Sequence, residues 1–234
     1  MLATACLALV AAGCAVPRAT VGVDGKLDVL GPLAKFSPEA LPGDWVVEND
    51  ADGLGKHLSV VEKDGVPALE IVSGANGLIV ARRTKASLLA TPYLSWGWNV
   101  EPYGLGYHPV RLIVGFYGGN PESPSWGSQP LRWLRSALPP HDRALAITWG
   151  ESALQRGSLI PPRKDADGAY RYTVRGGREN ADTWWLETVD LAKVYARAWP
   201  GDELDRVQIM FIGIAAVGGR PPATAYISEL ILSR

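Results

Sequence analysis

Nine short segments in which apolar and polar residues alternate constrain the fold of this chain more than any other feature of its sequence. Alternation with a period of two residues, between flanks rich in glycine, proline, asparagine and aspartate, is typical of β-strands that bury one face. Little helical periodicity separates the segments, which favours a sandwich of two sheets over a fold of alternating strands and helices. The nine segments are residues 67–73, 77–83, 93–100, 110–117, 144–149, 170–175, 183–189, 207–215 and 224–232.

Two of these segments indicate which side chains enter the core. In residues 93–100 and 110–117 one face is apolar, whereas the other mixes aromatic, small and charged side chains, among them Arg111 and Tyr117. On that mixed face Gly97 and Gly115 are expected to leave a hollow. The side chains expected in the core are Leu94, Trp96, Trp98, Val100, Leu112, Val114 and Phe116.

The expected fold class is all-β, an antiparallel two-sheet β-sandwich of jelly-roll type with two short helices. Residues 128–138 carry leucines at helical spacing, and residues 190–198 begin with an aspartate cap and stop at Pro200-Gly201. Residues 15–26 are expected to form a polar tether. No second linker or repeat follows, so residues 27–234 are expected to form a single domain.

The first 14 residues are similar to the signal peptide of a bacterial lipoprotein. Their apolar run is too short for a resident membrane helix and ends at Gly13-Cys14, which resembles a lipobox. Cys6 and Cys14 are the only cysteines. We expect cleavage before Cys14, lipid attachment to its thiol and a location in the cell envelope, on the periplasmic side of the outer membrane, because Ala15 carries no retention charge. The alternative is a disulfide or buried pair of the two cysteines.

Charge and motif content narrow the function classes. A net charge of -1 argues against nucleic-acid binding, which needs a basic face. His57, His108 and His141 are far apart in sequence, and no Gly-x-Ser-x-Gly nucleophile motif is present. Asp-Ala-Asp-Gly occurs at residues 50–53 and 165–168, but neither copy continues into a calcium loop, so both are interpreted as solvated turns. No cofactor or metal is expected.

Aromatic residues point to a ligand. The chain has nine tryptophans and three phenylalanines, and a half-buried Trp or Tyr ring can stack on the apolar face of a sugar. Arginine forks beside such rings can orient hydroxyl or uronate groups. The residues expected to bind a polysaccharide or envelope glycan are Arg83, Arg111, Tyr117, Trp149, Trp184, Trp185 and Glu187.

Two other interpretations stay open at this point. If most tryptophans are buried, a structural or protein-partner role in the envelope is favoured. If Glu151 and Glu187 face each other across a cleft, they form the carboxylate pair that a glycoside hydrolase needs. Glycan binding without catalysis is preferred to both.

Five segments carry a resemblance to a known family: residues 93–100, 111–116, 146–150, 185 with 189–191, and 225–230. In order and spacing they resemble a bacterial family catalogued as domain of unknown function 3047. They cover most of residues 27–232. The resemblance implies an exported β-sandwich, similar in outline to jelly-roll carbohydrate-binding modules, and carries no catalytic residues.

Overall fold

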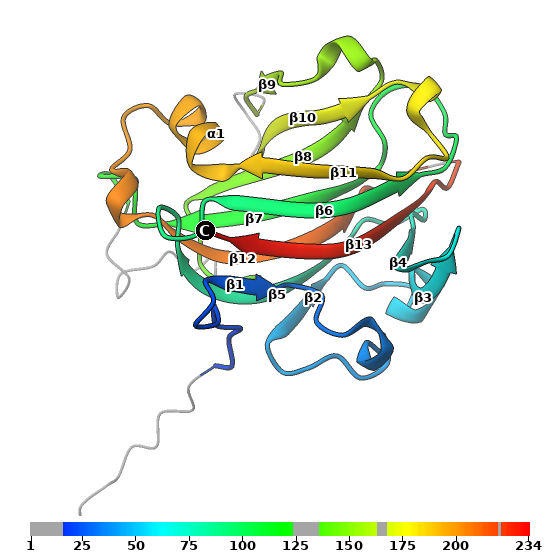
Figure 1. The fold of residues 1–234 in the computed structure, drawn as a ribbon, viewed down its shortest axis with the longest axis horizontal. Coiled ribbons are helices and arrows are strands. Elements are labelled where there is room, and N and C mark those ends of the chain that lie inside the picture. Colours follow the sequence, from blue (N-terminus) through cyan, green and yellow to red (C-terminus); the bar gives the residue numbers. More distant parts are fainter. Residues whose placement is uncertain (1–15, 124–135, 163–167, 220) are drawn as a thin grey trace, which may run out of the picture.

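Two β-sheets pack face to face in the computed structural model, which describes residues 16–123, 136–162, 168–219 and 221–234. The smaller sheet has the order β11-β6-β13-β4-β3, with β1 beside β13, and the larger has the order β2-β5-β12-β7-β8-β10-β9. In Figure 1 the strands β6, β11 and β13 lie in front of β7, β8 and β12. The expected all-β sandwich is confirmed.

The strand bounds match the expected alternation. The smaller sheet contains β1 (Lys26–Asp28), β3 (Leu58–Lys63), β4 (Val66–Val72), β6 (Tyr93–Val100), β11 (Trp185–Asp190) and β13 (Thr224–Ser233). The larger sheet contains β2 (Trp45–Glu48), β5 (Leu78–Ser87), β7 (Val110–Tyr117), β8 (Arg143–Gly150), β9 (Leu159–Ile160), β10 (Tyr170–Gly176) and β12 (Gln208–Ala216). All nine expected segments form strands. The four additional strands, β1, β2, β3 and β9, end a sheet or are too short to show alternation.

One strand pairing departs from the expected antiparallel arrangement. Strand β10 runs parallel to β8, with Tyr170 opposite Leu145 and Arg171 opposite Ala146. The connection from residue 151 to residue 169 is long enough for the crossover that a parallel pair requires, which a hairpin turn is not. This pairing decides which side chains of β10 lie next to those of β7 and β8.

The core lies between the sheets and contains the side chains expected there. Leu94, Trp96, Trp98 and Val100 from β6 are buried, as are Leu112, Val114 and Phe116 from β7. The Trp98 ring contacts Trp96 at 5.8 Å and Trp149 at 6.0 Å between centroids. The face assignment for both strands is confirmed.

The hollow expected beside two glycines is absent, because neighbouring side chains occupy it. A β-carbon at Gly115 would overlap the ring of Phe211, and one at Gly97 would overlap the hydroxyl of Ser228. Trp184 also lies over Gly97. Each glycine therefore admits a side chain from the adjacent strand or turn.

Helical structure is sparse among the residues that the structure describes. Helix α1 (Leu191–Ala198) confirms the second expected helix, and its cap is the Asp190 side chain, which accepts a 2.9 Å hydrogen bond from the Lys193 amide. Most of the first expected helix lies outside the described residues, and its last three residues, 136–138, are not helical. The 3₁₀ turns in the described part of the chain are η1 (Leu33–Lys35), η2 (Leu54–Lys56), η5 (Ala153–Gln155), η6 (Arg178–Asn180) and η7 (Leu204–Arg206).

The segment expected to act as a tether makes contact with the sandwich. Ala19 is buried, and its amide donates a 2.8 Å hydrogen bond to the carbonyl of Arg83. Residues 1–15, with the expected lipid-attachment site Cys14, lie outside the described residues. Over the part of the chain that is described, no helix combines the length and the apolarity needed to cross a membrane.

Candidate functional site

Two adjoining cavities lie on the outer face of the larger sheet, the face turned away from the core. Their volumes are about 570 and 450 Å³. They share the lining residues Arg111, Arg171, Val217 and Gly218, so the two arginines stand where the cavities meet. We call the two cavities together the sheet groove.

The floor of the larger cavity is built from outward-facing side chains of five neighbouring strands. The ladder places Ala215 of β12 between Ile79 and Arg111, and it places Ile113 of β7 opposite Ala146 of β8. Because paired residues share a face, these side chains form one mostly small and apolar surface. Pro161 and Pro162, which follow β9, form part of the wall.

Aromatic rings line the smaller cavity. They come from the segment between β6 and β7, in which Tyr103 and Tyr107 are half-buried. The Tyr103 hydroxyl donates a 2.9 Å hydrogen bond to the Gly150 carbonyl, and its ring meets the buried His108 edge-on at 4.7 Å. Burial lowers the pKa of His108 to about 4, so this histidine is neutral at neutral pH. Leu105, at 85% exposure, lies at the rim.

Arg111 and Arg171 are the unusual members of the lining. Neither guanidinium makes a hydrogen bond or an ion pair with any residue in the described part of the chain. The guanidinium carbon of Arg171 lies 4.7 Å from the centroid of the Tyr107 ring. Burial lowers the pKa of Arg111, and the positive charge of Arg171 lowers it further.

Three other half-buried arginines of this protein have carboxylate partners. The pairs are Arg82 with Asp44 at 2.8 Å, Arg143 with Asp202 at 2.9 Å, and Arg175 with Glu187. Arg111 and Arg171 differ from these three arginines, because no described carboxylate lies within ion-pair distance of either guanidinium.

Three of the seven residues expected to bind a ligand lie on the outer face of the larger sheet. Arg111 lines the sheet groove. Arg83 of β5 lies beside Phe211 and donates a 3.0 Å hydrogen bond to the Gly43 carbonyl. Tyr117 packs against a second apolar cluster that includes Phe211. Neither Arg83 nor Tyr117 lines the two cavities.

Three others face the interior between the sheets. On β11, Trp185 and Glu187 pair with Trp98 and Trp96, which are core residues, so both point inward. Trp149 is fully buried and donates a 3.2 Å hydrogen bond to the Gly177 carbonyl. A ligand reaches none of these side chains from the sheet groove.

Glu187 is an interior ion-pair member. Its side chain is 2% exposed, it accepts a hydrogen bond from Arg175, and it lies 3.6 Å from a guanidinium nitrogen of Arg156. The Arg175 guanidinium also stacks over the Trp185 ring at 3.7 Å. Glu151 is exposed. Neither glutamate lines the cavities, so the sheet groove does not bring together the carboxylate pair expected for a glycoside hydrolase.

Trp184 lies apart from the others, on the outer face of the smaller sheet. Its indole N–H donates a 3.1 Å hydrogen bond to the Lys63 carbonyl, and its ring lies over Gly97. The expected ligand-binding residues therefore lie in three separate places: the outer face of the larger sheet, the interior between the sheets and the outer face of the smaller sheet. Sequence reasoning missed Arg171, Tyr103 and Tyr107, which line the groove with Arg111.

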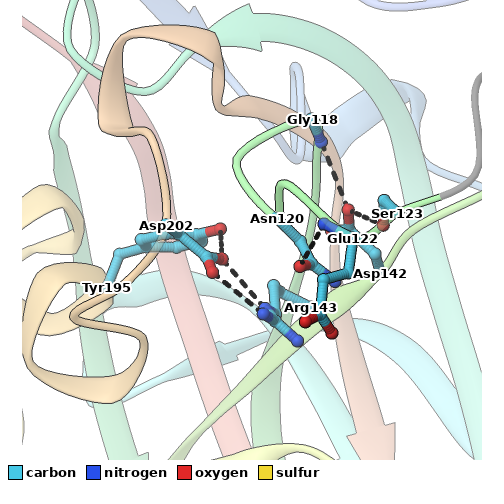
Figure 2. Close-up of polar contacts among 8 residues, drawn as sticks. All are labelled: Gly118, Asn120, Glu122, Ser123, Asp142, Arg143, Tyr195 and Asp202. Carbon is cyan, nitrogen blue, oxygen red and sulfur yellow. Dashed lines mark hydrogen bonds and ion pairs between the residues drawn. The ribbon is translucent and has the colours of Figure 1, made fainter.

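A second polar cluster, drawn in Figure 2, joins the end of β7 and the start of β8 to the segment after α1. Arg143 donates two 2.9 Å hydrogen bonds to Asp202, which also accepts a 2.6 Å hydrogen bond from the Tyr195 hydroxyl. Asp142 accepts hydrogen bonds from the Ser123 hydroxyl and the Gly118 amide. Burial raises the pKa of Asp142 against these two bonds. The contacts tie loops together and are a structural feature.

Metal ligation finds no support in the described residues. Within them, no three histidine, cysteine, aspartate or glutamate side chains lie close enough to hold an ion. In the first Asp-Ala-Asp-Gly turn, Asp52 accepts a 3.0 Å hydrogen bond from Asn76 and lies 3.6 Å from His57. The second copy lies outside the described residues except for Gly168.

Comparison with known proteins identifies a family. The family described as "Protein of unknown function (DUF3047)" matches residues 50–231. No curated protein matches the chain.

Solved structures with a similar outline include proteins that bind or cleave polysaccharides. The family 30 carbohydrate-binding module of a cellulosomal cellulase from Clostridium thermocellum is 12% identical, with a TM-score of 0.39 over 81% of this chain and 91% of that chain. A carbohydrate-binding module that recognises mannan is 15% identical, with a TM-score of 0.33 over 89% and 95%. A family 12 xyloglucanase from Bacillus licheniformis is 12% identical, with a TM-score of 0.40 over 85% and 94%. These TM-scores are too low to support the assignment of a ligand.

Proposed function

We propose that this chain, which belongs to the DUF3047 family, binds a saccharide chain in the sheet groove without catalysing a reaction. The observation that carries the proposal is the pair of adjoining cavities on one sheet face, with tyrosine rings in one and an apolar floor in the other. Each cavity has the volume of a small-molecule site, and two in a row suit an elongated ligand.

The lining has the chemistry that sugar rings require. Saccharides present apolar C–H faces as well as hydroxyl groups, so they bind where rings and small apolar side chains stand beside hydrogen-bond donors. Tyr103 and Tyr107 supply large surfaces with few torsions to immobilise. Ile113 and Ala146 supply the apolar floor, and Arg111 supplies donors.

The lining residues that the structure describes favour binding over hydrolysis. Glycoside hydrolases generally use two Asp or Glu side chains that flank the scissile bond. Among the described residues that line the two cavities there is no Asp or Glu. A saccharide in the sheet groove would meet two guanidinium groups and a neutral histidine instead.

Replacing Tyr107 with alanine is expected to weaken saccharide binding about tenfold, equivalent to about 1.4 kcal/mol, because it removes a ring from the groove. The measurement is isothermal titration of the purified protein with a panel of acidic and neutral polysaccharides. Tyr107→Phe should retain binding. Tyr93→Ala is the matched control, since Tyr93 is 41% exposed on the other sheet. Absence of binding to every polysaccharide, or unchanged binding by Tyr107→Ala, would contradict the proposal.

The proposal extends to the location of the protein. We expect Cys14 to be the lipid-modified N-terminal residue in cells, because the apolar run before it ends in Gly13-Cys14. Lipid attachment would hold the sandwich at the membrane and concentrate it along a polymeric ligand. Intact-mass measurement of protein extracted from membranes should show a chain that starts at Cys14 and carries diacylglycerol. A Cys14→Ser protein that stays in the membrane fraction would contradict this expectation.

A further inference from the structure

We infer that the sheet groove selects saccharides that carry a carboxylate or sulfate group, and that this anionic group binds between Arg111 and Arg171. The inference rests on the proposed function, because it names the class of saccharide that the same groove takes. Arg171, which the alternation pattern did not single out, becomes a specificity-determining residue.

The strand register puts the two arginines on one face with a single strand between them. Arg111 on β7 pairs with Thr148 on β8, and Arg171 on β10 pairs with Ala146 on the same strand. Residues 146 and 148 are two apart, so their side chains point to the same side of the sheet. Both are small, which leaves the space above β8 open to a ligand group that both guanidinium groups can reach.

The charged side chains in the described lining of the groove are all positive. Arg111 and Arg171 are the only Lys, Arg, Asp or Glu side chains among the described residues that line the cavities. The whole chain has a net charge of -1, so the positive groove is not the consequence of a basic protein. Two like charges side by side repel each other, and a partly buried guanidinium without a counter-ion loses hydration without gaining a partner.

A bound oxyanion would offset both the repulsion between the two guanidinium groups and their loss of hydration. Burial and the charge of Arg171 lower the pKa of Arg111, and a bound anion would act in the opposite direction by stabilising the charged form. Guanidinium groups fit carboxylate and sulfate oxygens through paired, planar N–H donors, which makes these hydrogen bonds strong and directional.

The surroundings of the arginine pair indicate that the anion is part of a sugar. The Arg171 guanidinium lies over the Tyr107 ring, which restricts its movement and keeps the aromatic surface next to the charge. Ile113 and Ala146 lie on the other side of the pair. An acidic sugar would place its charged group on the guanidinium groups and its C–H faces on the ring and the apolar floor.

The test compares ligands that differ only in charge. Purified protein is titrated calorimetrically with polygalacturonate and its methyl ester, and with dextran sulfate and dextran. We expect at least one acidic polymer to bind at least tenfold more tightly than its neutral counterpart, and the two pairs distinguish carboxylate from sulfate. Poly-glutamate, which has carboxylates without sugar rings, should bind at least tenfold more weakly than the preferred polymer.

Arg111→Gln and Arg171→Gln should each reduce binding of the acidic polymer at least tenfold and reduce binding of the neutral polymer by a smaller factor, because a neutral sugar loses only hydroxyl contacts. Arg83→Gln is the matched control, because Arg83 lies on the same sheet face and does not line the cavities. Melting temperatures establish folding, and that of Arg111→Gln should be equal to or above the parent value, since the variant removes a charge that has no ion-pair partner among the described residues.

Each outcome separates this inference from the proposed function. Equal binding of the acidic and neutral forms, or unchanged binding by both arginine variants, overturns the selection for an anion while saccharide binding stands. Equal binding of poly-glutamate overturns the saccharide part. Failure of every polysaccharide to bind overturns both.

Discussion

Trp98→Ala should lower the free energy of unfolding by about 3–5 kcal/mol, because it opens a cavity at the centre of the sandwich. The Trp98 side chain is fully buried between Trp96 on its own strand and Trp149 on the opposite sheet. For a protein of this length the loss corresponds to a fall in melting temperature of roughly 6–20 °C.

Urea unfolding followed by circular dichroism measures this effect, and an unchanged denaturant dependence would assign it to the native core. Trp98→Phe is the matched variant. It keeps a ring in the same place, so its free energy of unfolding should fall by less than that of Trp98→Ala. Trp184→Ala, on the outer face of the smaller sheet, should also lose less than Trp98→Ala. Melting of Trp98→Ala within a degree or two of the parent would contradict the core assignment.

Glu187→Leu should destabilise the protein by about 3–5 kcal/mol, because it leaves a guanidinium in the interior without its carboxylate. The Arg175 side chain is 13% exposed and donates its hydrogen bond to Glu187 while it stacks over Trp185. Removing one partner of a buried ion pair lowers the free energy of unfolding strongly, even where the intact pair adds little to stability, because the remaining charge stays buried.

The double variant Arg175→Met with Glu187→Leu removes both charges and should recover most of the loss. Chemical denaturation of the single and double variants completes the cycle. Polysaccharide binding by the double variant should match that of the parent, since neither residue lines the sheet groove. A single variant as stable as the parent would show that Glu187 is not held in an interior ion pair.

The sequence predicts the sandwich well where one strand face is uniformly apolar. Trp96 and Trp98 alternate with smaller residues on β6, so a period of two residues assigns both to the core, and the structure confirms it. The cap at Asp190 likewise marks the start of α1, because the side chain can satisfy a free amide in the first turn.

Applied to β11, the same reasoning would assign the wrong face. Leu186 is 83% exposed and Glu187 is buried, the reverse of what polarity suggests. The cause is Arg175, which neutralises Glu187 from β10, twelve residues earlier in the chain. No pattern local to β11 contains that partner.

The candidate groove depends on information that alternation cannot supply. Alternation identifies Arg111 as an outward-facing residue, but its proximity to Arg171 follows from the parallel pairing of β8 with β10. The prediction of a hollow at Gly115 was wrong for a similar reason, because the side chain of Phe211 on β12 fills the space. Local periodicity predicts the sheet face on which a side chain lies. Which side chains lie next to each other on neighbouring strands depends on the order and direction of the strands.

Saccharide binding in the sheet groove is tested most directly by a crystal structure of the protein with an acidic oligosaccharide, such as an oligogalacturonide. The predicted result is a sugar chain that crosses both cavities, with a carboxylate between Arg111 and Arg171 and a ring against Tyr107. A saccharide bound only elsewhere, for example over Trp184 on the smaller sheet, would contradict the assignment of the groove as the binding site.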